Sequence, residues 1–124
     1  MDTERAVCES FQDAAQLVGR RWVPQIVWVL LDGPRRYSVL RAAISEISDT
    51  VLSDRLRELE GAGILTRAVT PSTPVLIEYA LSERGRDLAK VIEGLATWAD
   101  RWSAVDADGP GRPTRTAGST AGRA

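Results

Sequence analysis

Apolar residues recur at intervals of three and four along the first part of the chain, the spacing of one face of a helix. A first helix is predicted over 5–18 and a second over about 23–31, with Gly19 ending the first. Pro24 suits the first turn of the second helix, and the turn-forming sequence 32–34 stops it. The inward face of the first helix comprises Val7, Phe11, Ala14, Ala15 and Val18.

Two further helices are predicted over 39–45 and 49–61, each preceded by a serine whose hydroxyl can accept a free backbone N–H, Ser38 and Ser48. The inward stripe of the first of them comprises Tyr37, Leu40 and Ile44. In the second, one face is apolar through Leu52, Leu56 and Leu59. The opposite face is therefore polar and turned outward, and it carries Thr50, Ser53, Asp54, Arg57 and Glu58.

The pattern then changes to β-rich runs over 64–69 and 75–81, joined by a Pro-rich turn, which predicts a hairpin. Ser82 caps a last helix that reaches about Ser103, with an apolar stripe of Leu88, Val91, Ile92, Leu95, Trp98, Ala99 and Trp102. We therefore expect a mainly α fold with a small β-hairpin wing, the winged helix-turn-helix, over 1–104. The segment 105–124 is expected to be a disordered tail, since it is rich in Gly, Pro, Thr, Ser and Ala.

Composition narrows the function classes. The chain has one cysteine, Cys8, and no histidine, so an internal disulfide, a Cys/His zinc site and an imidazole-based triad are excluded. No Gly-rich phosphate loop is present, and we expect no catalysis, no metal and no cofactor. The longest apolar stretch, 22–31, is too short for a membrane span of about 20 residues. The N-terminus lacks a basic start, so a cytoplasmic location is expected.

Charge is distributed unevenly. The net charge is −1, which by itself does not indicate a nucleic-acid partner. The segment from Arg20 to Arg67, however, contains eight arginines and six acidic residues, so its local charge is +2. The basic signal is therefore modest and confined to the predicted helix-turn-helix.

Several separated motifs resemble the HxlR-type family of winged helix-turn-helix transcriptional regulators. They are "LLDGPRRYSVLR" (30–41), "LSDRLRELEGAGIL" (52–65), "EYALSERGRDL" (78–88) and the later "LATWADRW". The resemblance covers about 8–102 and implies a homodimer formed by the first and last helices. It also implies that the fourth helix enters the major groove of double-stranded operator DNA, with the wing on the backbone. The wide stripe of the last helix suits a dimer interface, although core packing within one subunit would also explain it.

The resemblance carries over DNA-binding roles to particular residues. Arg35, Arg36 and Ser38 would contact phosphates, although the two arginines could also belong to a solvated loop. The fourth helix would read DNA through Thr50, Ser53, Asp54 and Arg57. Alternatively, Arg55 and Arg57 could pair with Glu58 and Glu60 along their own helix.

Three departures from the family pattern bear on DNA affinity. The family has a basic residue near the start of the reading helix, where this chain has Asp49-Thr50, and often Gln at the position of Asp54. Its wing carries an arginine close to Glu78, whereas here only Arg67 is nearby. Each loss removes a charge that neutralises phosphate, so we expect weakened DNA binding.

Two features indicate an effector. Trp28 stands where the family has a basic residue, and with Phe11, Trp22, Trp98 and Trp102 it could form a pocket for a flat apolar ligand, or simply improve packing. Cys8 occupies the position of a family cysteine that some relatives use to sense oxidants or electrophiles. Its closeness to Arg5 and to a helix start could lower its pKa, although an inert thiol would fit as well.

The sequence thus predicts a sequence-specific DNA-binding regulator that responds to a small aromatic ligand or a thiol-reactive signal. The alternative is a protein that binds or sequesters a small molecule on the same fold, with weak or no DNA binding.

Overall fold

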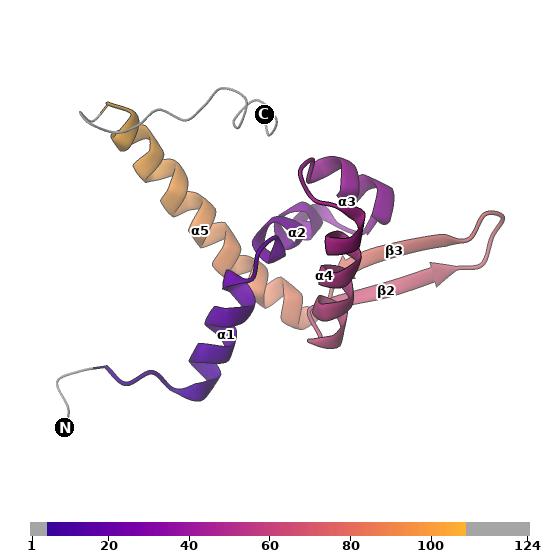
Figure 1. The fold of residues 1–124 in the computed structure, drawn as a ribbon, viewed down its shortest axis with the longest axis horizontal. Helices are drawn as coiled ribbons and strands as arrows, with labels where there is room; N and C mark the ends of the chain where they lie inside the picture. The colour runs from indigo at the N-terminus through magenta and orange to yellow at the C-terminus, as the bar shows by residue number, and fades with distance from the viewer. Residues whose placement is uncertain (1–4, 109–124) are drawn as a thin grey trace.

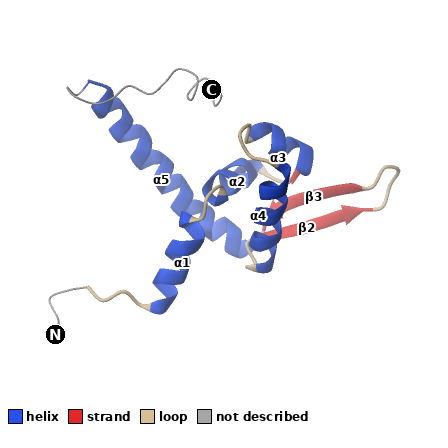
Figure 2. Cartoon of the chain, viewed as in Figure 1, coloured by secondary structure: helices blue, strands red, loops and turns tan. Residues whose placement is uncertain are grey.

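The computed structural model describes residues 5–108, which form a helical body with a projecting hairpin (Figures 1 and 2). Figure 1 shows α2, α3 and α4 gathered at the base of the hairpin, whereas α1 and the far half of α5 point away from this body. The elements in chain order are α1 (Glu9–Gly19), α2 (Val23–Val29), the 3-10 turn η1 (Leu30–Asp32), β1 (Arg35–Arg36), α3 (Tyr37–Ala43), α4 (Asp49–Gly61), β2 (Leu65–Thr70), β3 (Leu76–Leu81) and α5 (Glu83–Asp108). Within residues 5–108, no helix is both long and apolar enough to cross a membrane.

The core lies between α2, α3, α4 and the first half of α5. The predicted inward face of α4 is confirmed, because Leu52, Leu56 and Leu59 are all buried. They pack with α2 and with α5, whose contributions are Val23, Ile26, Val27, Ala89 and Ile92. Burying one such side chain stabilises the fold by about 1.5–3 kcal/mol, so this cluster fixes the orientation of α4.

The sheet has three antiparallel strands in the order β1-β3-β2, and its hairpin was predicted. The short strand β1 was not predicted, because two residues are too few for an alternating pattern. Arg35 lies opposite Tyr79, and Arg36 lies opposite Glu78. The pairing with β3 therefore ties the segment before α3 to the base of the wing.

Strand β1 also explains why one predicted cap is wrong. Arg36 is held in an extended conformation, and α3 begins directly after it at Tyr37, so Ser38 lies inside the helix rather than before it. The predicted cap at Ser48 is confirmed, since its hydroxyl accepts the Val51 N–H at 3.2 Å. At the other end of the chain, α1 begins at Glu9 rather than at residue 5.

Helix α5 begins as predicted and ends later. Ser82 Oγ accepts the Gly85 N–H at 3.0 Å, which is the predicted cap. The helix then continues to Asp108, past the expected end near Ser103 and into the predicted tail. The remainder of that tail, 109–124, lies outside the described residues.

Candidate functional site

The outward face of α4 is accessible. Thr50 is exposed, Ser53 and Asp54 are half-buried, and Arg57 has 74% of its side chain exposed. Arg57 Nη1 lies 3.1 Å from Asp54 Oδ1, so Asp54 is its partner and the alternative pairing with Glu60 is wrong. The alternative pairing of Arg55 with Glu58 is present, at 3.6 Å. An exposed ion pair of this kind is worth less than about 1 kcal/mol, so Arg57 can exchange Asp54 for a phosphate or a base at little cost.

The acid at the start of α4, Asp49, has a side chain that is 72% exposed and has two hydrogen-bond partners. Asp49 Oδ1 accepts hydrogen bonds from Tyr37 Oη and Arg41 Nε, both at 2.8 Å. These hydrogen bonds, that of Tyr37 first, hold the pKa of Asp49 below its ordinary value. Asp49 therefore ties α3 to α4, a role that neither periodicity nor the family pattern had suggested.

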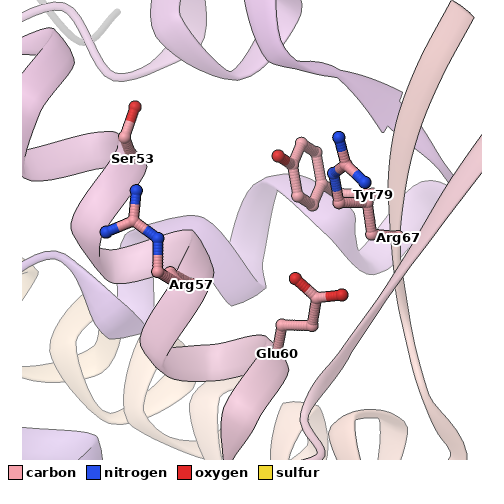
Figure 3. Close-up of a pocket in the computed structure, with 5 residues that line it drawn as sticks. All are labelled: Ser53, Arg57, Glu60, Arg67 and Tyr79. Atoms are coloured by element: carbon pink, nitrogen blue, oxygen red, sulfur yellow. The ribbon is translucent and has the colours of Figure 1, made fainter.

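A row of polar side chains crosses the sheet beside α4. Tyr79 on β3 lies directly opposite Arg35 on β1 and Arg67 on β2, and opposed residues share one face of a sheet. Figure 3 shows Arg67 and Tyr79 across a pocket from Ser53 and Arg57 of α4. The pocket is lined by Ser53, Arg57, Glu60, Arg67 and Tyr79.

This pocket brings together three of the predicted DNA-binding residues, Ser53, Arg57 and Arg67. Tyr79 was missed by sequence reasoning, although the hairpin register would have placed it opposite Arg67. Arg67 lies opposite Tyr79 and shares its face of the sheet. The pocket is polar, and it holds two arginines together with the carboxylate of Glu60.

The other predicted phosphate-binding residues do not act as one cluster. Arg35 and Arg36 are successive residues of a strand, so their side chains leave opposite faces of the sheet. Arg35 Nη1 donates to the Pro34 carbonyl oxygen at 2.9 Å, and Ser38 is exposed on α3. Only Arg35 shares a face with the pocket.

Cys8 is exposed at the N-cap of α1. Its Sγ lies 3.4 Å from Ser10 Oγ. Hydrogen bonds from the Ser10 side chain and then from the Phe11 backbone lower the pKa of the thiol. The cause is therefore the first turn of the helix, and Arg5, which the sequence had suggested, is not among the contributors. No group of three or more metal-ligating side chains occurs within residues 5–108.

The aromatic residues are not gathered into one pocket within a single chain. Phe11 on α1 is 63% exposed, and α1 diverges from the part of α5 that bears Trp98 and Trp102 (Figure 1). Trp28 on α2 is also exposed, whereas Trp22 is half-buried against the core with Arg21 stacked on its ring at 4.8 Å.

The far half of α5 presents a continuous apolar stripe to solvent. Five residues spaced alternately by four and three are each at least 42% exposed: Val91, Leu95, Trp98, Trp102 and Val105. This is the spacing of a helix–helix seam. Ile92 on the adjoining face is buried in the core, so α5 serves the core with one face and leaves the other without cover in one chain.

Comparison with known proteins fits this architecture. The model of the HxlR-like helix-turn-helix family matches residues 17–107. The HTH-type transcriptional regulator YvaP of Bacillus subtilis is 43% identical, covering 77% of this chain and 89% of its own. The B. subtilis regulator YodB is 40% identical, covering 77% and 86%.

Solved structures agree. The reduced form of the transcriptional regulator YodB superposes with a TM-score of 0.70 over 77% of this chain and 94% of its own. YodB has also been solved after diamide treatment and with bound quinone, with TM-scores of 0.68 and 0.67. The redox regulator HypR in its oxidised form is 28% identical with a TM-score of 0.71, covering 74% and 95%. The fold, the polar face of α4 and these matches together show that the chain belongs to the HxlR-like helix-turn-helix family.

Proposed function

We propose that this protein is a transcriptional regulator that binds operator DNA in the cytoplasm with α4 and the β2–β3 wing. The observation that carries the proposal is the pocket lined by Arg57 of α4 and Arg67 of the wing. Arg57 and Arg67 would contact phosphates of the DNA backbone, while Thr50 and Ser53 would face the base edges.

The regulator acts as a homodimer held by α1 and α5. The exposed stripe from Val91 to Val105 and the exposed Phe11 give each chain an apolar surface that a second copy would cover. A two-fold dimer presents two copies of α4, which would read half-sites about one helical turn, or roughly 34 Å, apart.

The effector is a thiol-reactive or planar aromatic compound. Cys8 is exposed and its pKa is lowered, so more of it is the reactive thiolate at neutral pH. In a dimer, Phe11, Trp98 and Trp102 from two chains could together contact a flat ligand. The relative YodB, solved with quinone and after diamide treatment, is the precedent.

An electrophoretic mobility shift with the DNA upstream of its own gene tests the proposal. We expect a shift that competitor DNA of unrelated sequence does not abolish, and that diamide removes. Absence of a shift at low salt would reject the regulator. If planar compounds then quenched tryptophan fluorescence, the alternative of a ligand-sequestering protein would replace it.

A further inference from the structure

A polar bridge joins the end of α1 to the middle of α4. Arg20, which follows α1, donates from Nε to Glu58 Oε1 and from Nη2 to Glu58 Oε2, both at 2.8 Å. The guanidinium thus grips the carboxylate with two parallel hydrogen bonds, the arrangement that fixes direction as well as distance. This contact spans 38 positions of the chain, so it connects two elements that are otherwise far apart in sequence.

Arg55 makes a second polar contact between the end of α1 and α4. Its side chain is only 14% exposed, its Nε donates to the Arg21 carbonyl oxygen at 2.9 Å, and its Nη1 lies 3.6 Å from Glu58 Oε2. Two successive residues after α1 are therefore held by two residues of α4. The next residue, Trp22, has a left-handed backbone with φ of 77°, so the junction between α1 and α2 is a defined turn.

The bridge stands out because α1 is otherwise loosely attached. None of the residues of α1, all of which are described, is buried, and only Leu17 and Val18 near its end are partly buried against the core. The helix packs mainly on α2. Apart from the partly buried Leu17 and Val18, the end of α1 therefore meets α4 through these charged contacts.

We propose that Arg20, Arg55 and Glu58 are positioning residues that transmit the orientation of α1 to α4. The inference rests on the proposed function for its biological meaning, since α1 carries Cys8 at one end and the bridge at the other. A change at Cys8 or in the packing of α1 in the dimer moves the α1–α2 junction, and the paired hydrogen bonds carry that movement to the helix that faces DNA. Single exposed ion pairs rarely matter, but a bidentate pair joined to a third charge is the exception.

Hydrogen exchange tests this coupling without DNA. Amide exchange of the peptides that cover α4 is followed by mass spectrometry in the reduced full-length protein and after diamide treatment. Diamide accepts two electrons and two protons when two Cys8 thiols form one disulfide, which in the proposed dimer would join the two chains. The variants are Arg20→Gln and Glu58→Gln, with Glu93→Gln as the control, because Glu93 is an exposed carboxylate of α5 outside both the bridge and the pocket.

We expect oxidation to change α4 exchange by about fivefold or more in the unaltered protein and in Glu93→Gln, as allosteric couplings typically do. The change should fall by at least about threefold in either bridge variant. The charge-swapped double variant Arg20→Glu with Glu58→Arg should recover part of it, which a general loss of stability would not allow.

Two results would overturn the inference. One is an α4 response of equal size in the bridge variants and the control, and the other is no response of α4 in the unaltered protein. Both can be read whether or not the protein shifts operator DNA, so failure of the bridge and failure of the regulator are separate outcomes.

Discussion

Replacing Val91 with serine measures how much the exposed stripe of α5 contributes to dimerisation. Val91 begins the stripe and is 57% exposed in one chain. Serine and valine have similar helix propensities, so the substitution leaves α5 intact. Val75, which precedes β3 in the wing, is also 57% exposed. It provides a matched control, because the wing projects away from α1 and from the far half of α5 (Figure 1).

The expected size follows from burial. Burying a whole valine side chain contributes about 1.5–3 kcal/mol, so covering its exposed part contributes about 1–1.5 kcal/mol per chain. A two-fold dimer loses this contribution twice, about 2–3 kcal/mol, which raises the dimer Kd by about 30- to 150-fold.

Sedimentation equilibrium over a dilution series measures the dimer Kd of the unaltered chain and of each variant directly. We expect Val91→Ser to dissociate at far higher protein concentrations than the unaltered chain, and Val75→Ser to match the unaltered chain. Equal Kd values for the two variants would refute the reasoning that α5 is the dimer surface.

Four further predictions concern stability, pH and binding. A Cβ on Gly85 would collide with the Ile64 carbonyl oxygen, so Gly85→Ala should lower the urea-unfolding free energy by about 1–3 kcal/mol, whereas Gly94→Ala, with open space around it, should not. The hydrogen bonds from Arg20 lower the pKa of Glu58 below its ordinary value of 4.5. Its carboxylate therefore stabilises the fold at pH values above 4.5, and this contribution disappears as the pH falls through the pKa of the folded state. At pH 7, Glu58→Gln should therefore be less stable than the unaltered chain by at most about 1 kcal/mol and should melt at a lower temperature. In acid the two melting temperatures should converge. A difference that stays constant with pH would contradict this. Arg67→Gln should reduce the salt slope of DNA binding by about 0.9 and Lys90→Gln should not. Cys8→Ser should retain DNA binding and lose its response to diamide; a retained response would remove Cys8 as the sensor.

Apolar periodicity predicted α4 well, but the inward face that it predicted for α1 is wrong in the single chain, since no residue of α1 is buried. The stripe of α4 and the serines before α4 and α5 fixed these helices, because a single helix face or a single hydroxyl determines each feature locally. Strand β1 was not predicted because its two residues form a strand by pairing with β3, which no local pattern indicates. The cap predicted at Ser38 is wrong for the same reason, because the strand ends directly before α3.

The candidate site was predicted only in part. The outward face of α4 followed from periodicity, but the partners of its charges did not. Asp49 is bound by Tyr37 and Arg41, and Glu58 by Arg20, through contacts between separate elements that no local pattern encodes. The two acids that made DNA binding look unfavourable, Asp49 and Asp54, both have a basic partner in the folded chain.

Hydroxyl-radical footprinting on the DNA upstream of its own gene tests most directly whether paired copies of α4 read an operator. The account predicts two protected segments about one helical turn, roughly 34 Å, apart on one side of the duplex, and their loss when diamide is added. A uniform cleavage pattern at protein concentrations well above the dimer Kd would contradict the account.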